Sequence, residues 1–93
     1  MKLKHHTSKD RNRVYLVDED KQIGEIVYTY LNDHIIDITH TEIDSNYRGQ
    51  NLGQKLIDEL VSYARNHHLK AKASCPYVAK VFESSNNYND IIA

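Results

Sequence analysis

The chain has 93 residues, of which 40% are apolar and 27% charged, and this length predicts a single domain. Its 12 basic and 13 acidic residues are mixed along the chain, so neither nucleic acid nor an anionic membrane is expected as a partner. With no long apolar run and no signal peptide, a cytoplasmic location is expected. The single cysteine, Cys75, excludes an internal disulfide, and no Cys/His spacing resembles a metal site.

The first third of the chain predicts antiparallel strands. Residues 2 to 6 are expected to form a short edge strand, and residues 7 to 13 an exposed loop. Residues 14 to 18 and 23 to 31 are rich in β-branched and aromatic side chains. They flank the charged turn at residues 19 to 22, which predicts a β-hairpin.

A further strand is predicted at residues 35 to 43, after a turn at Asn32-Asp33. Side chains alternate between the two faces of a strand, so His40 and Glu42 are expected on the same face as Ile38. A β-bulge in the strand would reverse this assignment. An apolar face that becomes ionisable just before a loop indicates a cleft at that point.

An amphipathic helix is predicted over residues 51 to 67. Its apolar side chains fall on one stripe, which predicts packing against a sheet: Leu52, Leu56, Ile57, Leu60, Val61 and Ala64. The loop before the helix contains Gly49 and Gly53. Free backbone N–H groups at a helix N-terminus, together with the helix dipole, favour a phosphate or another anion. We therefore predict an anion-binding loop between this strand and this helix.

Residues 70 to 74 predict another strand, so strand, helix and strand form one βαβ crossover with the loop at the carboxyl end of the first strand. Cys75-Pro76 then starts a short helix over residues 76 to 84, with Cys75 at its N-cap, where the thiolate is favoured. Residues 85 to 93 read as a polar turn and an apolar end that adds a strand or docks on the core. The predicted fold is therefore α+β, with a mostly antiparallel sheet, one long helix and one short helix.

The loop sequence is similar to a known signature. The run I-D-S-N-Y-R-G-Q-N-L-G, from Ile43 to Gly53, resembles the acetyl-coenzyme A signature of the GCN5-related N-acetyltransferases. The compact pattern H-T-E-I, Y-R-G-Q, C-P-Y-V-A and Y-N-D-I resembles their short stand-alone members of about a hundred residues. The resemblance implies that the loop amides hold the coenzyme A pyrophosphate and that the preceding strand pairs with the pantetheine arm. The implied coenzyme-binding residues are Ile43, Arg48, Gly49, Gln50, Asn51, Leu52, Gly53 and Gln54.

The chain also departs from the family pattern. Asn51 replaces the middle glycine of the signature; asparagine tolerates unusual backbone angles, but weaker coenzyme binding is expected. Longer members have two helices that form much of the acceptor pocket, and here only the loop of residues 7 to 13 takes their place. An open acceptor side suits an amine on a protein or another large partner, or a pocket completed by a second subunit. The chain is expected to be a monomer or a weak dimer.

Acetyl transfer to an amine requires a base, stabilisation of an oxyanion and a proton for the departing thiolate. Glu42 is the candidate base, and His40 is a candidate to relay the proton or hold Glu42. The alternatives are that Glu42 is an exposed carboxylate that only tunes the charge of the sheet and that His40 is a packed or solvated histidine. The resemblance aligns Cys75 with a position near the coenzyme sulfur, and there it is expected either to form an acetyl-cysteine or to line the site without a covalent role.

The acid is less well defined. Longer family members often have a tyrosine acid where this chain has Phe82, which cannot donate a proton. That role is either dispensed with or passed to Cys75, Tyr77 or Tyr88.

Three functional hypotheses follow. The first is an acetyl-coenzyme A-dependent N-acetyltransferase. The second is a coenzyme A-binding module with little or no catalysis. The third is an interaction domain whose glycines serve only the turn between strand and helix.

Overall fold

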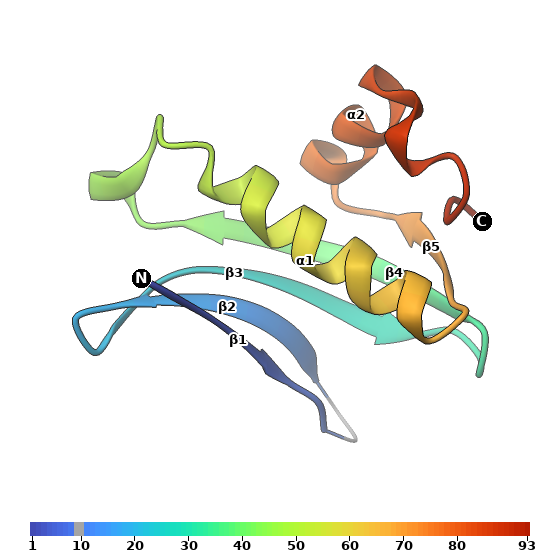
Figure 1. The fold of residues 1–93 in the computed structure, drawn as a ribbon, viewed down its shortest axis with the longest axis horizontal. Helices are drawn as coiled ribbons and strands as arrows, with labels where there is room; N and C mark the ends of the chain where they lie inside the picture. The colour runs from blue at the N-terminus through green and yellow to red at the C-terminus, as the bar shows by residue number, and fades with distance from the viewer. Residues whose placement is uncertain (9–10) are drawn as a thin grey trace.

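The computed structural model describes residues 1–8 and 11–93. A five-stranded sheet has the order β1 (Lys2–His6), β2 (Asn12–Asp18), β3 (Lys21–Tyr30), β4 (Ile35–Ile43) and β5 (Lys70–Ala73). Neighbouring strands are antiparallel except β4 and β5, which are parallel and joined through α1 (Leu52–Asn66). α1 lies across one face of the sheet, and α2 (Pro76–Ser84) follows β5 (Figure 1). The α+β class and the single βαβ crossover predicted from the sequence are confirmed.

The core lies between the sheet and α1. Strand β2 buries alternate residues, as expected of a strand with one covered face. All six residues of the predicted helix stripe are buried, at 4% exposure or less: Leu52, Leu56, Ile57, Leu60, Val61 and Ala64. Burial of one such leucine or isoleucine side chain contributes about 1.5–3 kcal/mol, so packing of α1 on the sheet is a main source of stability.

The hairpin formed by β2 and β3 differs in detail from the prediction. Its turn has two residues instead of four, because Glu19 and Asp20 adopt φ of 49° and 66°, as a type I′ turn requires. Strand β2 begins at Asn12, so the predicted loop of residues 7 to 13 is shorter than expected. Residues 9 and 10 of that loop lie outside the described residues.

One prediction about β4 is wrong because this strand contains a bulge. Val27 pairs with His40, but the next residue, Tyr28, pairs with Ile38, which leaves Thr39 as an extra residue in β4. The bulge reverses the alternation of side chains beyond this point. His40 and Glu42 therefore do not continue the apolar face of the strand; Thr41 and Ile43 do.

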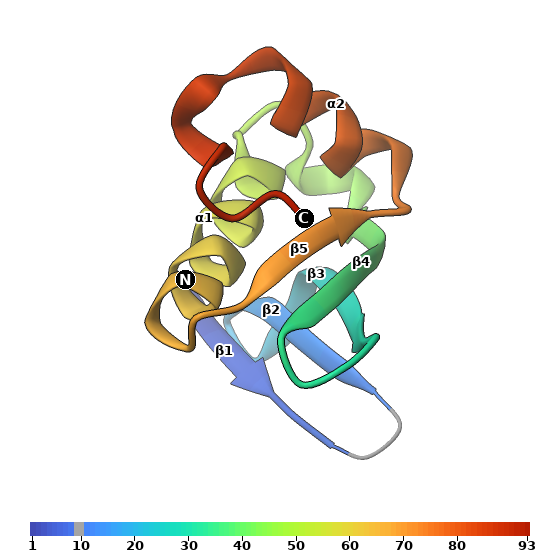
Figure 2. The same ribbon diagram turned by 90° about the vertical axis from the view of Figure 1, so that its right-hand side faces the viewer.

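The C-terminal segment docks on the free side of β5. Ile91 is 2% exposed, and Ile92 bridges in parallel to Ala71. The Ala71 N–H donates to the Ile91 carbonyl over 2.6 Å, and the Ala93 N–H donates to the Ala71 carbonyl over 2.9 Å. Figure 2 shows this end of the chain beside β5, with α1 and α2 beyond it. The prediction that this segment docks on the core or adds a strand is confirmed.

Candidate functional site

The candidate site starts where β4 loses its partner β5. The last ladder pair is Ile38 with Ala73, after which the chain turns into α2 and the Cys75 N–H donates to the Ile38 carbonyl over 2.9 Å. Further along, the Asp44 N–H donates to Ile23 of β3. Since backbone groups alternate in direction along a strand, those of Thr41 and Ile43 point away from β3, into the gap beyond β5. Because β5 ends at Ala73, β4 has a short open edge beyond Ile38.

The loop after β4 is held by side chains of the β2–β3 hairpin. Asp44 accepts a hydrogen bond from the Asn46 N–H over 2.9 Å and pairs with Lys21 at 3.2 Å. These contacts, the Asn46 N–H first, hold the pKa of the Asp44 carboxyl below its usual value. The Tyr47 hydroxyl donates to Asp18 over 3.0 Å. The hairpin therefore fixes the loop before it reaches α1.

The start of α1 presents unpaired backbone donors. Gly49 has φ of 83°, and Asn51 is left-handed at φ 58° and ψ 30°, so Asn51 supplies the backbone conformation for which asparagine is suited. The Asn51 side chain makes no capping hydrogen bond, and the first helical bond runs from the Lys55 N–H to the Asn51 carbonyl. The amides of residues 52 to 54 therefore have no acceptor within the helix and can bind an anion.

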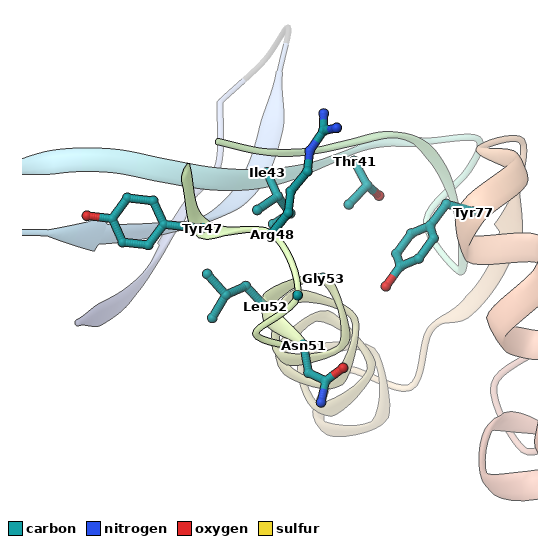
Figure 3. A pocket seen from close by; sticks show the side chains of 9 residues that line it. Thr41, Ile43, Tyr47, Arg48, Asn51, Leu52, Gly53 and Tyr77 are labelled. Carbon is teal, nitrogen blue, oxygen red and sulfur yellow. The ribbon is translucent and has the colours of Figure 1, made fainter. Parts of the chain in front are cut away.

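A cavity of about 350 Å³ joins this helix start to the open edge of β4 (Figure 3). The residues that line it are Thr41, Ile43, Tyr47, Arg48, Gly49, Asn51, Leu52, Gly53 and Tyr77. Six of the eight residues implied by the resemblance are among them, and the exceptions are Gln50 and Gln54. Gln54 instead donates a hydrogen bond to Asp58 over 3.0 Å.

Tyr77 of α2 forms the opposite wall of this cavity. In Figure 3 its phenol extends from α2 toward the start of α1. A Cβ atom on Gly53 would stand 2.6 Å from the Tyr77 hydroxyl, so Gly53 is required for this close approach. From the sequence, Tyr77 was a candidate acid and was not expected in the wall of this cavity. Its position one residue after Pro76, in the first turn of α2, was the available signal.

Cys75 lies at the junction of β5 and α2. Its side chain is only 6% exposed and makes no capping bond to α2; instead its thiol contacts the Thr41 hydroxyl, with Sγ and Oγ1 3.7 Å apart. The preceding residue is anchored as well, because the Ser74 hydroxyl donates to Asp37 over 2.7 Å. Cys75 is therefore held at the fork between β4 and β5, on the side of Thr41. Thr41 was not among the predicted site residues, because the position of the bulge could not be read from the sequence.

Glu42 and His40 lie on the other face of β4. Their carboxylate and imidazole are 3.7 Å apart, and their side chains are 70% and 57% exposed. Glu42 lines a shallow depression of about 180 Å³ together with Gln22, Ile23, Gly24 and Asp44. Because neighbouring residues of a strand point to opposite faces, Thr41 and its contact Cys75 lie on one face of β4 and Glu42 lies on the other.

The two other aromatic residues of this region serve packing. The Tyr88 hydroxyl donates to Asp58 over 2.7 Å and accepts a hydrogen bond from Gln54. Burial, followed by the bond to Asp58, raises the pKa of Tyr88. Phe82 is 6% exposed, and its ring lies 5.3 Å from that of Tyr88. Of the candidate acids, Tyr77 lines the cavity, and Cys75 contacts Thr41, which also lines it.

Within residues 1–8 and 11–93, no helix is long and apolar enough to cross a membrane. Those same residues hold no group of three His, Cys, Asp or Glu side chains arranged to bind a metal ion.

Three kinds of comparison relate this chain to known proteins. The family model described as GCN5-related N-acetyl-transferase matches residues 13–91. Protein NATD1 of Gallus gallus is 31% identical over 55 residues, which are 59% of this chain and 50% of that protein. Protein NATD1 of Danio rerio is 25% identical over 75 residues, or 81% and 68% of the two chains. The chain spans about half the length of most NATD1 proteins that it matches.

Solved structures show the same fold. A GCN5-like putative N-acetyltransferase from Staphylococcus aureus has a TM-score of 0.76 and 29% identity, covering 98% of this chain and 88% of that one. A GNAT family acetyltransferase from Elizabethkingia anophelis with acetyl-CoA bound has a TM-score of 0.70 and 14% identity, covering 89% and 72%. The family model covers more than half of the chain and includes the whole helix-start loop. This chain belongs to the GCN5-related N-acetyltransferase family.

Proposed function

We propose that this protein transfers an acetyl group from acetyl-coenzyme A to an amine on a protein or another large acceptor. The observation that carries the proposal is the cavity of about 350 Å³, which joins the free amides of α1 to the open edge of β4. The free amides of α1 can bind a pyrophosphate, and the open edge of β4 can pair with an extended arm that contains amide groups. Coenzyme A contains both groups, a pyrophosphate and a pantetheine arm with two amides.

Residues of the cavity have separate roles in this proposal. The amides of residues 52 to 54 bind the pyrophosphate, and Arg48 adds a positive charge beside them. The Arg48 guanidinium is in none of the six ion pairs formed by the described residues. The backbone of Thr41 and Ile43 pairs with the pantetheine arm, which directs the thioester toward Cys75.

In the proposed acetyl transfer, the base comes from one face of β4 and the acid from the side of the cavity. Acetyl-coenzyme A supplies a thioester whose carbonyl carbon is open to attack by a neutral amine. Glu42 accepts the proton that the amine loses, either directly or through water. Cys75 and Tyr77 are the groups near the cavity that can donate a proton to the departing thiolate. In a covalent variant, the Cys75 thiolate takes the acetyl group first and passes it to the amine.

A titration with acetyl-coenzyme A and coenzyme A tests the proposal. Backbone amide shifts followed by NMR should cluster on residues 43 to 54 and around Cys75. Mass spectrometry should then detect acetyl transfer to lysine-containing or N-terminal peptides, and an added acetyl on Cys75 would identify the covalent variant. If no amide shifts appear at millimolar ligand, the proposal is wrong and the interaction-domain hypothesis replaces it.

A second candidate function is coenzyme A binding with little or no catalysis. It is favoured by the separation of Glu42 from Cys75 across β4 and by the exposure of the Glu42 side chain. This candidate predicts the same amide shifts without transfer to any peptide. The peptide assay therefore distinguishes the two functions.

A further inference from the structure

A cavity of about 460 Å³, which we call the β5 notch, lies at the outer edge of β5. Its walls come from β5, from α2 with the turn that follows it, and from the C-terminal segment (Figure 2). Ala79, Phe82 and Glu83 are its α2 residues, and helical periodicity places them across the helix from Tyr77. The β5 notch shares no lining residue with the cavity at the start of α1, so it is a separate site.

The outer edge of β5 is only partly paired. The Ala71 N–H and carbonyl bond to Ile91 and Ala93 of the C-terminal segment. Backbone groups alternate in direction along a strand, so those of Ala73 point to the same edge. Within residues 1–8 and 11–93, the Ala73 N–H and carbonyl have no backbone partner on this edge. An extended segment beside Ala73 would supply the missing donor and acceptor, as Ile91 and Ala93 do for Ala71.

Two asparagine side chains line the opposite wall of the β5 notch. The turn that carries them is closed by other groups: the Asn87 N–H donates to the Ser85 hydroxyl over 3.1 Å, and the Asn89 N–H donates to the Asn86 carbonyl over 3.4 Å. In the part of the chain that the structure describes, the side-chain amides of Asn86 and Asn89 are left free. An asparagine amide offers one acceptor group and one donor group, which match those of a peptide backbone.

Between these polar groups the interior of the β5 notch is apolar. Ala73 and Ala79 are half-buried and carry only a methyl group, so they leave room beside the ring of Phe82, which is 6% exposed. Ile92, on the C-terminal segment, is 38% exposed at this site. An apolar side chain placed here would be removed from water on several sides.

The charges at the rim of the β5 notch are balanced. Lys72 of β5 and Glu83 of α2 are both exposed, and neither is in the six ion pairs formed within residues 1–8 and 11–93. One charge of each sign gives no net attraction for a phosphate or a nucleic-acid strand. Free backbone groups, free amides and an apolar interior match an extended polypeptide with an apolar side chain instead.

We propose that the β5 notch binds an extended segment of a partner polypeptide, which adds a strand beside Ala73 and inserts one apolar side chain against Phe82. The C-terminal segment already uses this edge, since Ile92 bridges in parallel to Ala71. The partner extends the same row of pairing by one position, and Asn86 and Asn89 bind its outer peptide groups. This binding requires no coenzyme and is independent of the proposed acetyl transfer.

A titration with a capped pentapeptide, followed by NMR, tests this proposal. The peptide has a central leucine with two threonines on each side, because β-branched residues favour the extended form. Amide shifts should cluster on Ala73, Ala79 and Asn86 and leave residues 43 to 54 unchanged. A dissociation constant of about 1 mM is expected of a few backbone hydrogen bonds and one buried side chain. Hydrogen exchange of the Ala73 amide should slow when the peptide binds.

Two controls separate strand pairing from unspecific contact. The same peptide with N-methylated backbone amides cannot donate hydrogen bonds and should bind about tenfold more weakly. Ala79→Gln extends a longer side chain into the β5 notch and should weaken binding of the unmodified peptide about tenfold. Lys80→Gln, at the neighbouring position outside the β5 notch, should bind the peptide like the unaltered protein.

The absence of shifts at peptide concentrations several times the expected dissociation constant would overturn the proposal. Equal affinity for the N-methylated peptide would do so as well, because the backbone of Ala73 would then have no role. The same residues could also shift when the concentration of the protein alone is raised. That result would assign the β5 notch to a second copy of this chain and refute a separate partner.

Discussion

The two faces of β4 differ in chemistry although they belong to the same strand. On the face toward α1, Thr41 contacts Cys75, and Ile43 lies so close to Gly24 that a Cβ atom there would be 2.8 Å from the Ile43 side chain. This face is apolar and walled by helices. On the opposite face, Glu42 and His40 are more than half exposed, and their ionisable groups lie 3.7 Å apart.

The open face has a second ionic group next to Glu42. Glu25, the direct cross-strand partner of Glu42, is 7% exposed and accepts hydrogen bonds from Arg11 at 2.7 Å and Arg13 at 3.1 Å. The arginines offset the repulsion that two facing carboxylates would otherwise cause. In the proposed function, the face toward α1 holds the acyl carrier and the open face supplies the base. The bulge at Thr39 decides which of the following side chains of β4 lie on each face.

Ile38→Asn should have the largest effect, because Ile38 lies on the apolar face of β4 and is only 1% exposed. The substitution removes a buried apolar side chain and leaves an amide without hydrogen-bond partners in the core. We expect a loss of about 4 kcal/mol in the free energy of unfolding, measured by urea denaturation, which approaches the whole stability of a small domain. His40→Asn is the control, since it introduces the same residue on the open face, where the His40 side chain is 57% exposed, and should cost about 0.5 kcal/mol. Equal losses in the two variants would refute this assignment of the faces.

Glu42→Gln tests the chemistry of the open face. If Glu42 is the base, kcat/KM for peptide acetylation should fall about a hundredfold, while coenzyme affinity and stability stay unchanged. A coupled assay of thiol release measures the rate, and calorimetry measures the affinity. Glu83→Gln, which removes an exposed carboxylate on α2, is the control. An unchanged rate in Glu42→Gln would identify Glu42 as a solvated surface charge.

Gly53→Ala tests the wall of the helix face. The added methyl group meets the Tyr77 hydroxyl, so the phenol must move and narrow the cavity, which should weaken coenzyme A binding about tenfold. Unfolding should change by less than about 0.5 kcal/mol, because the clash is with the end of a flexible side chain. The same substitution in a Tyr77→Leu background should have little effect on binding. An equal loss of affinity in both backgrounds would show that Tyr77 does not transmit the effect.

The smallest effect is expected at the other end of the helix face, where His5 anchors β1. His5 lies 2.6 Å from the Tyr28 hydroxyl and packs on Tyr63. Burial lowers the pKa of His5 below 6.5, although Glu59 opposes and His67 reinforces this shift. The unfolded chain therefore binds the proton more readily, so His5 stabilises the fold above pH 6.5 and loses this contribution as the pH falls.

Thermal unfolding at pH 7.5 and 5.5 measures this contribution. The melting temperature of the unaltered protein should fall on acidification by about 2 °C more than that of His5→Gln. Glutamine retains a hydrogen-bonding group but does not titrate. Identical pH dependence of the two proteins would show that His5 is not the titrating group.

Local patterns were sufficient to predict much of this molecule. The stripe of α1 follows from helical periodicity, and α2 begins at Pro76 as predicted, because proline suits the first helical position. The two glycines and Asn51 marked the helix-start loop, and the positive φ angles of Gly49 and Asn51 agree with that interpretation. These signals lie within a few residues of the structure they specify.

The remaining features depended on contacts between segments that are distant in the chain. The bulge at Thr39 arises from how β4 pairs with β3, and no pattern within β4 reveals it. It decided which side chains share a face with Cys75. The same holds for Tyr77 over Gly53 and for Tyr88 on Asp58, which meet only when α2 and the segment after it pack beside α1. The sequence by itself determined the elements and the loop at the start of α1, because periodicity and capping are local, while tertiary pairing decided which side chains share each face of β4.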